Sequence, residues 1–420
     1  MRRSIGTTAV VAALALAATA CGSDNGDDNA AGGGTDGELS GTVTFWDTSG
    51  DAEKGTFEEL AKGFTDEHPG VTVEYVNVGF DGAQDRFKNA AQAGEAPDVM
   101  RTEVAWVSEF AQLGYLKPLD GTAAVDGQDD FLGAPWSSTQ YDGATYAVPQ
   151  VTDTLALFYN KELLEEAGVE VPETLEDIKN STEAFEEIGV TPLYLRGDDA
   201  YWFFPFIYGE GGDLLDAEAE KVTIGEPAGV RAFEQIKDLV DSGAATTDLT
   251  DGWDNMMTQF GNGDVAMMIN GPWAINDAYN GIGEENVGVA PMPAGSEGQG
   301  APLGGWNYSL YTGSANQEAA EEFIRYMASA DSQQTLTEEL NLLPTRASVY
   351  EQSSVQENEM VAFFGPAVEV AHGRPWIPQA GGLFDPLRDE IQRTLDEVVT
   401  PEEAASNVAD KYRDLLDGWE

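Results

Sequence analysis

Apolar residues recur along the chain at the two spacings that distinguish strands from helices. Short runs rich in branched and aromatic residues predict strands, and the first of them is Gly-Thr-Val-Thr-Phe-Trp at 41–46. Apolar residues three and four positions apart predict a helix that includes Phe57, Leu60 and Phe64. Further strands are predicted at 71–76 and 97–100, and further helices at 81–94 and 105–113. Because strands and helices alternate, we predict an α/β body with a mainly parallel sheet.

The alternation continues with more helix over residues 162–290. Helices are predicted at 162–167, 175–188, 201–208 and 230–241, and strands at 192–195, 265–269 and 287–290. The β run at 304–311 is expected to return to the first body, and helical segments close the chain. The pattern therefore predicts two α/β lobes joined by more than one crossing, an arrangement that can close over a ligand. We assign 41–152 and 304–350 to lobe 1, and 153–303 and 351–420 to lobe 2.

The stretch 141–164 contains the first predicted crossing between the lobes. Asp142-Gly143 is a hairpin signal, and the β runs 145–148 and 154–159 follow it. Pro149 stands between these runs and cannot donate to a central ladder, so it marks a sheet edge or a place where the strand changes sheets. We therefore expect the chain to cross between the lobes at Pro149.

Two polar residues of the same stretch have predicted roles. Asn160 is expected to cap a helix that begins at Lys161. Asp153 follows the predicted crossing and would face whatever lies between the lobes. The alternative is a turn aspartate that bonds to its own backbone, and the residues alone leave both possibilities open.

The N-terminus has the pattern of a secretory signal peptide, predicted at 1–20. A basic start is followed by an apolar run of about a dozen residues, which is shorter than the roughly 20 that span a bilayer. Cys21 is the single cysteine, and its position resembles the lipidated cysteine of bacterial lipoproteins. The alternative is a plain secreted protein with a free thiol. Residues 21–40 are predicted to be a flexible linker, since glycine, aspartate, asparagine and alanine predominate there.

Charge and composition exclude several functions. The formal net charge of −54 argues against nucleic acid and against a polybasic membrane surface. Only His68 and His372 are present, and the chain has no phosphate-binding loop, nucleophile elbow or complete EF-hand loop. We therefore expect no metal and no cofactor. A secreted glycosidase that uses two carboxylates stays open as an alternative.

Aromatic residues stand beside acids, glycines and prolines at predicted strand ends and helix starts. The chain has 9 tryptophans, 14 tyrosines and 18 phenylalanines. Examples are Trp46 before Asp47, Tyr201 after Asp199, and Trp273 after Gly-Pro. Aromatic rings bury the apolar faces of sugars, and charged side chains bind the hydroxyl groups. For each single aromatic residue, core packing is the alternative.

Three stretches carry a resemblance to a known family. They are Ala-Pro-Asp-Val at 96–99, the stretch 141–164, and Gly-Asp-Val-Ala-Met-Met-Ile-Asn-Gly-Pro-Trp at 263–273. The chain resembles the solute-binding lipoproteins of ATP-driven carbohydrate importers, in particular the branch that binds maltose, maltodextrin or trehalose. The resemblance implies a two-lobe periplasmic-binding-protein-like (type II) fold. It also implies a monomer without enzymatic activity, anchored at the outer face of the cell membrane, which binds an α-linked oligosaccharide and delivers it to an ABC permease. Another oligosaccharide or a polyamine is the alternative ligand.

The resemblance also implies ligand-binding positions. They are Asp153, Asp199, Tyr201, Trp273 and Phe384. The family's tryptophan and arginine after Pro-Asp-Val do not carry over, since this chain has Arg101-Thr102-Glu103 there, with Trp106 further on. From position alone we add Asp47, Glu103, Trp306 and Arg374 as candidate contacts.

Overall fold

The computed structural model describes residues 39–420, which form one compact unit. The predicted signal peptide, Cys21 and the predicted linker as far as residue 38 lie outside the described residues. None of the helices in the described part is both long and apolar enough to cross a membrane.

A six-stranded sheet forms the centre of the first lobe. Its strand order is β16-β6-β15-β3-β1-β2. The strands are β1 (Gly41–Asp47), β2 (Val71–Asn77), β3 (Val99–Glu103), β6 (Ala147–Asp153), β15 (Gly304–Leu310) and β16 (Leu343–Pro344). β1 runs parallel to β2 and β3, but β15 is antiparallel to β3 and β6, and β16 is antiparallel to β6. The predicted predominance of parallel strands is therefore wrong. β15 enters the sheet after a long excursion of the chain and not through a strand–helix–strand unit.

A five-stranded sheet forms the centre of the second lobe, in the order β11-β8-β12-β7-β13. The strands are β7 (Ala156–Asn160), β8 (Thr191–Tyr194), β11 (Ala245–Thr246), β12 (Val265–Asn270) and β13 (Val287–Ala290). β8 is parallel to β11 and β12, whereas β7 is antiparallel to β12 and β13. Every residue of β12 is buried, as expected of a strand that is covered on both faces.

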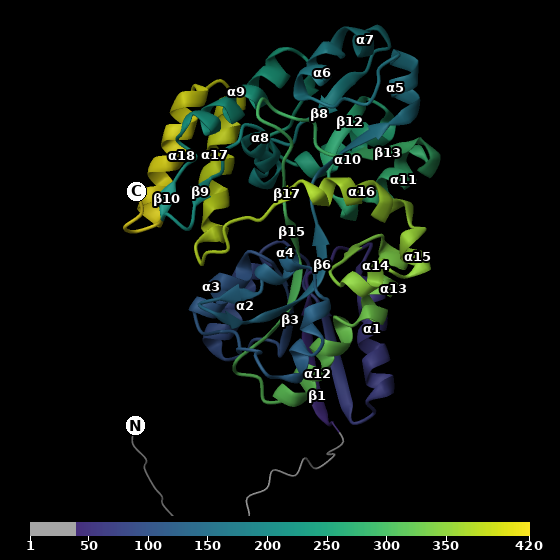
Figure 1. Ribbon diagram of the computed structural model, residues 1–420, viewed down its shortest axis with the longest axis vertical. Coiled ribbons are helices and arrows are strands. Elements are labelled where there is room, and N and C mark those ends of the chain that lie inside the picture. Colours follow the sequence, from purple (N-terminus) through teal and green to yellow (C-terminus); the bar gives the residue numbers. More distant parts are fainter. Residues whose placement is uncertain (1–38) are drawn as a thin grey trace, which may run out of the picture. The chain divides into compact units, whose positions relative to one another are not determined.

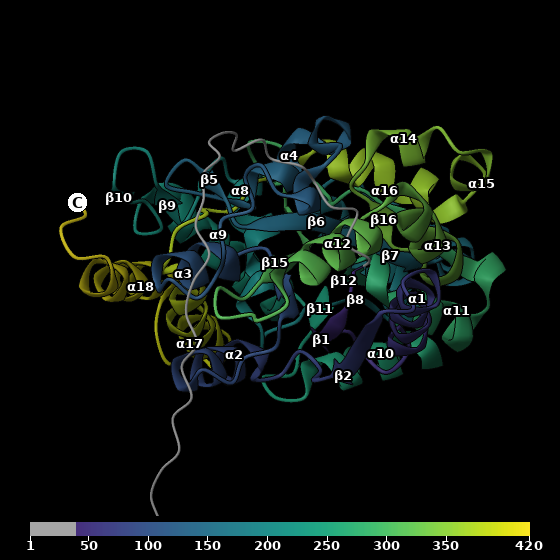
Figure 2. The ribbon, with the colours of Figure 1, turned by 90° about the horizontal axis from the view of Figure 1, so that it is seen from below.

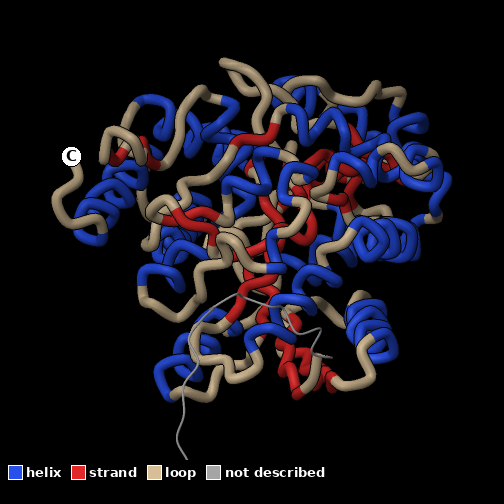
Figure 3. Tube along the Cα trace, turned by 60° about the horizontal axis from the view of Figure 1, so that its bottom comes forward, coloured by secondary structure: helices blue, strands red, loops and turns tan. Residues whose placement is uncertain are grey.

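Helices cover both faces of each sheet. The longer strands therefore lie in the interior, between layers of helices (Figure 3). In the first lobe, one face is covered by α1 (Lys54–Glu67), α12 (Gln317–Met327) and α13 (Ala330–Leu340), and the other by α2 (Ala83–Ala93) and α3 (Trp106–Gln112). In the second lobe, one face is covered by α5 (Lys161–Ala167), α6 (Leu175–Asn180), α7 (Thr182–Glu187), α8 (Phe204–Gly209), α9 (Pro227–Asp241), α17 (Phe384–Leu395) and α18 (Pro401–Leu415). The other face is covered by α10 (Gly252–Asn262), α11 (Ile275–Ile282) and α16 (Glu359–Glu369). The shorter helices are α4 (Gly133–Ser137), α14 (Ala347–Tyr350) and α15 (Ser353–Gln356).

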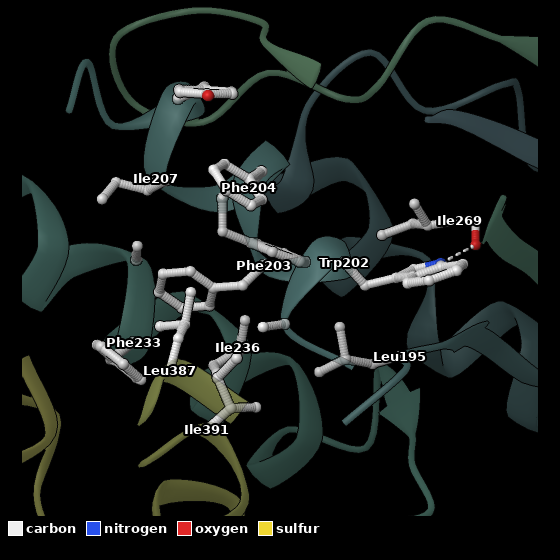
Figure 4. Close-up of a cluster of buried hydrophobic side chains, with 14 of the residues drawn as sticks. Leu195, Trp202, Phe203, Phe204, Ile207, Phe233, Ile236, Ile269, Leu387 and Ile391 are labelled. Atoms are coloured by element: carbon white, nitrogen blue, oxygen red, sulfur yellow. Dashed lines mark hydrogen bonds between the residues drawn. The ribbon is translucent and has the colours of Figure 1, made fainter. Parts of the chain in front are cut away.

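The largest apolar core lies in the second lobe, and Figure 4 shows part of it. Phe203 and Phe233 pack with ring centroids 4.6 Å apart, and Leu387 of α17 is fully buried there. The indole Nε1 of Trp202 donates a 2.7 Å hydrogen bond to the carbonyl oxygen of Ile269. Each fully buried large side chain contributes about 1.5–3 kcal/mol. The C-terminal helices α17 and α18, which lie beside one another in Figure 2, thus belong to this core.

The chain passes between the two lobes more than once, as predicted. It leaves the first sheet after β6 and enters the second with β7, then returns with β15, which pairs with β6 (Figure 1). After β16 it goes back to the second lobe, where α16 packs. The pair β14 (Ala301–Pro302) and β17 (Ala371–His372) joins the segment that precedes β15 to the segment that follows α16.

Short-range signals gave correct predictions at two places. Asp142 and Gly143, with φ angles of 47° and 78°, form the turn between β4 (Gln140–Tyr141) and β5 (Ala144–Thr145). The side chain of Asn160 accepts hydrogen bonds from the backbone of Glu162 and Leu163 and so caps α5.

The single helix predicted at 175–188 is divided into α6 and α7. It divides at Ser181, whose hydroxyl donates to a carbonyl of the preceding turn.

Candidate functional site

The crossing between the lobes follows Asp153 and does not occur at Pro149. β6 continues through Pro149 and ends at Asp153, so the predicted position of the crossing is wrong. The missing N–H of Pro149 is tolerated because the pairing of β6 with β15 shifts register at this level. Its carbonyl oxygen accepts hydrogen bonds from the side chains of Gln333 and Thr345, at 3.4 and 3.3 Å.

Asp153 is buried where the chain leaves the first sheet, with 7% of its surface exposed. The hydroxyl of Tyr201 donates to Asp153 Oδ1 at 3.4 Å and lies 3.2 Å from the carbonyl oxygen of Pro302. Within residues 39–420, the hydrogen bond that Asp153 accepts comes from this tyrosine and not from its own backbone. Asp153 is therefore joined to η3 (Ala200–Phe203) of the second lobe.

Arg374 connects the same place to the first lobe. It is 6% exposed, and its Nε donates to the carbonyl oxygen of Leu303 at 3.0 Å. Its Nη2 forms an ion pair with Glu103, the last residue of β3. The guanidinium also lies 5.3 Å from the centre of the Tyr201 ring. We call Glu103, Asp153, Tyr201 and Arg374 the site cluster.

The electrostatics of the site cluster follow from burial. Burial raises the pKa of Asp153 to about 7; Arg374 opposes this rise, and Glu103 adds to it. Burial also raises the pKa of Tyr201 well above 10, so its hydroxyl stays protonated. Near neutral pH the cluster thus offers one carboxyl group that titrates, one hydroxyl and one guanidinium.

Trp273 and Asp199 lie on the second-lobe side of the cluster. Trp273 is half-buried in η4 (Pro272–Ala274), and its ring lies 6.5 Å from that of Tyr201. The ring folds back over Gly271, where any Cβ would overlap it. Asp199 Oδ1 accepts a 2.9 Å hydrogen bond from the backbone N–H of Tyr201. Its Oδ2 lies 3.7 Å from Arg196 Nη2, so Asp199 helps to position Tyr201.

Trp306 lies on the first-lobe side, opposite Glu103 on β15. The guanidinium of Arg101 lies 4.1 Å from the centre of its ring. Arg101 is only 2% exposed, and its Nε donates to Gln150 at 2.7 Å. The sequence placed Arg101 after the third strand, whereas it lies inside β3. The alternation of side chains along the strand from Glu103 was the signal that points to Arg101.

The other two predicted residues are not joined directly to the site cluster. Asp47 is fully buried, and it accepts hydrogen bonds from the backbone and hydroxyl of Ser49, from Tyr75 and from Asn77. Its oxygens are therefore occupied within its own lobe. The ring of Phe384 lies 6.1 Å from that of Phe204, which in turn lies 6.2 Å from the ring of Tyr201. In the part of the chain that the structure describes, no group of three histidine, cysteine, aspartate or glutamate side chains is placed to hold a metal ion.

The chain matches the family model described as bacterial extracellular solute-binding protein over residues 49–334. The chain belongs to this family. Among solved structures, this solute-binding protein is 58% identical to the GacH receptor of Streptomyces glaucescens GLA.O, which was solved unliganded and in complex with acarbose and an acarbose homolog. The similarity covers 91% of this chain and 100% of that one, with a TM-score of 0.89. The predicted two-lobe α/β fold is thereby confirmed.

The chain also has relatives by sequence, of which we describe two. The diacetylchitobiose binding protein DasA of Streptomyces coelicolor is 26% identical, and the similarity covers 99% of each chain. A maltooligosaccharide ABC transporter solute-binding lipoprotein of Streptococcus pneumoniae is also 26% identical, with 92% of this chain and 91% of the relative covered.

Proposed function

We propose that this solute-binding protein binds an α-linked oligosaccharide between its lobes and delivers it to an ABC permease. The observation that carries the proposal is the site cluster, in which Asp153 and Glu103 of the first sheet meet Tyr201 and Arg374. The names of the relatives support the ligand class, because they include an acarbose receptor and a maltooligosaccharide-binding lipoprotein.

The chemistry of the cluster suits a sugar. An ionised carboxylate accepts hydrogen bonds from sugar hydroxyls, and a guanidinium donates to them, through charge-assisted bonds. Half-buried rings such as Trp273 and Tyr201 offer apolar surface to the C–H faces. The contacts between the lobes support closure on the ligand, since a sugar that touches both lobes favours the form in which they approach.

We also propose how the protein is divided into lobes and where it is located. Residues 41–152 and 304–350 form one lobe, and 153–303 and 351–420 the other. The membership of β15 in the first sheet and of β7 in the second supports this division, with Asp153, the last residue of β6, at the boundary. The protein is an extracytoplasmic monomer without enzymatic activity, anchored to the membrane by a lipid on Cys21. A relative that is named a lipoprotein supports the anchor.

A thermal-unfolding screen tests the proposal. A ligand that binds only the folded protein raises its stability by mass action. We expect maltotriose or acarbose to raise the unfolding temperature, and cellobiose, xylobiose and spermidine to have no effect. Stabilisation by spermidine alone would contradict a sugar ligand. Release of shorter products from maltotriose would identify an enzyme.

Replacing Trp273 with alanine is expected to weaken maltotriose binding by about 2 kcal/mol, or roughly 30-fold, because the variant loses an aromatic contact surface. Isothermal titration calorimetry measures the change. Trp419→Ala is the matched control, since Trp419 lies near the C-terminus against the second-lobe core. This variant should bind maltotriose with the wild-type affinity. Unchanged affinity in Trp273→Ala would remove Trp273 from the site.

Saccharide affinity is expected to fall about tenfold between pH 8 and pH 6. The pKa of Asp153 is raised to about 7, so acidification protonates the acceptor and weakens its bonds to hydroxyl groups. Asp153→Asn should bind weakly and without this pH dependence. The stability of the unliganded protein changes with pH in the opposite direction to the affinity. Because the folded pKa lies above the ordinary value of about 3.9, ionisation of Asp153 lowers stability as pH rises through 7.

Titrations at pH 6, 7 and 8, together with thermal unfolding, measure both effects. Asp153→Asn should unfold at a higher temperature than the wild type at pH 8, since it removes a buried charge. A wild-type affinity that is constant across this pH range would show that Asp153 does not bind the ligand in its ionised form.

A further inference from the structure

The turn between β2 and α2 displays an aromatic ring that the proposed site does not include. Phe80 is 54% exposed, although a phenylalanine is usually buried. Gly79 and Gly82 flank the turn with φ angles of 68°, a conformation that favours glycine. The carbonyl oxygen of Phe80 accepts a 3.1 Å hydrogen bond from the N–H of Ala83. The backbone of the turn therefore holds Phe80 at the surface.

Phe80 belongs to an ordered group of three rings. Its ring is parallel to that of Trp106, with an interplanar angle of 8° and centroids 5.7 Å apart. Trp306 is nearly perpendicular to both, with centroids 5.8 Å from Phe80 and 5.9 Å from Trp106. Trp106 is only 6% exposed. One face of Phe80 thus rests on a buried ring, so the exposed ring is held in place before any ligand arrives.

The three rings adjoin the site cluster. Trp306 is paired with Glu103 across the sheet, and Glu103 forms an ion pair with Arg374. The first turn of α2 also approaches the second lobe, because a Cβ at Gly381 would lie 2.8 Å from Gln84 Nε2. The turn that carries Phe80 is therefore on the side of the first lobe that meets residues 374–383.

We infer that Phe80 is a stacking platform for one further sugar ring, so that the protein prefers longer oligosaccharides to disaccharides. The inference rests on the proposed function. A single ring stacked on a tryptophan matches the C–H face of one pyranose. The carboxylate of Asp81, which is exposed beside it, is an acceptor for the hydroxyl groups of that sugar. A protein partner is disfavoured, because one isolated ring is far smaller than the roughly 800 Å² that each side of a stable interface buries.

Calorimetric titration with maltose and with maltotetraose tests the inference. Phe80→Ala is expected to weaken maltotetraose binding about tenfold and maltose binding less than twofold. Phe80→Trp keeps an aromatic face and should keep the wild-type preference. Leu113→Ala is the matched control, since Leu113 is a 46% exposed apolar residue of the same lobe. It should bind both sugars as the wild type does.

The outcomes separate this subsite from the proposed function. If the wild type binds both sugars and Phe80→Ala changes neither affinity, the subsite is refuted and the proposed function stands. Equal losses for maltose and maltotetraose also refute it, because Phe80 would then act on the shared part of the ligand. If the wild type binds neither sugar, both proposals fail. Unfolding temperatures of the variants within about 2 °C of the wild type would show that surface substitutions leave the fold intact.

Discussion

Gly304→Ala is expected to weaken saccharide binding by about 100-fold while the protein stays folded. Gly304 lies opposite Asp153 in the pairing of β15 with β6. A Cβ at this position would overlap Asp153 Oδ1 and would lie 2.6 Å from the hydroxyl oxygen of Tyr201. Both atoms are at the ends of side chains that can move aside, so the cost falls on the geometry of the site more than on the fold.

Calorimetry with maltotriose measures the loss of affinity, and thermal unfolding shows whether the variant stays folded. Gly55→Ala is the matched control, because a Cβ at Gly55 meets nothing within 4 Å and alanine favours the α1 helix. The control should bind normally and should be slightly more stable. Wild-type affinity in Gly304→Ala would mean that neither Asp153 nor Tyr201 needs its observed position to bind the ligand.

Glu210→Ala is expected to lower the free energy of unfolding by about 3 kcal/mol. The carboxylate of Glu210 is 1% exposed and follows α8. It accepts hydrogen bonds from the backbone and hydroxyl of Ser296, at 3.0 and 2.6 Å, from Arg231 Nε at 2.6 Å, and from Gln235. Its removal abolishes four hydrogen bonds to a buried carboxylate at once, and hydrogen bonds to a charged group contribute more than those between neutral groups.

Urea unfolding at pH 7 measures the loss, with Glu234→Ala as control, since Glu234 is an exposed residue of α9. Burial by itself would raise the pKa of Glu210, but the bonds from Ser296 and Arg231 outweigh it and hold the pKa below its ordinary value. The contribution of Glu210 is therefore complete above the ordinary pKa of about 4.3 and is lost as pH falls through the folded pKa. The two proteins should thus differ less at pH 3, and a difference that grows on acidification would contradict this account.

Local patterns predicted the elements of the fold well. The strands at 41–46 and 265–269 and the helix at 230–241 correspond to β1, β12 and α9. These elements depend on apolar spacing and on residues a few positions apart, such as the Asn160 cap. The direction of a strand within its sheet has no such signal. The antiparallel pairing of β15 was missed because the direction of a strand depends on where the chain has travelled before it.

The candidate site residues likewise include properties that the local sequence predicts and properties that only the fold decides. Asp47 and Asp153 both end a strand and are both buried, so nothing nearby in the chain separates them. The carboxylate oxygens of Asp47 are occupied by hydrogen bonds from Ser49, Tyr75 and Asn77. Asp153 instead accepts a hydrogen bond from a tyrosine of the other lobe. Phe80 and Arg101 were not among the predicted ligand contacts, because an exposed ring or a buried guanidinium becomes apparent only after the strands have paired.

The amino-acid sequence by itself determined the two α/β lobes, the repeated crossing of the chain and membership of the solute-binding family. These depend on the spacing of apolar residues and on short motifs that no distant contact can change. Only the tertiary structure decided which acids remain available and which groups meet. The ion pair of Arg374 with Glu103 joins residues 271 positions apart, and the burial that raises the pKa of Asp153 comes from segments remote in the chain. Both properties depend on the complete tertiary structure, because desolvation and charge pairing arise from all the groups that surround a residue in space.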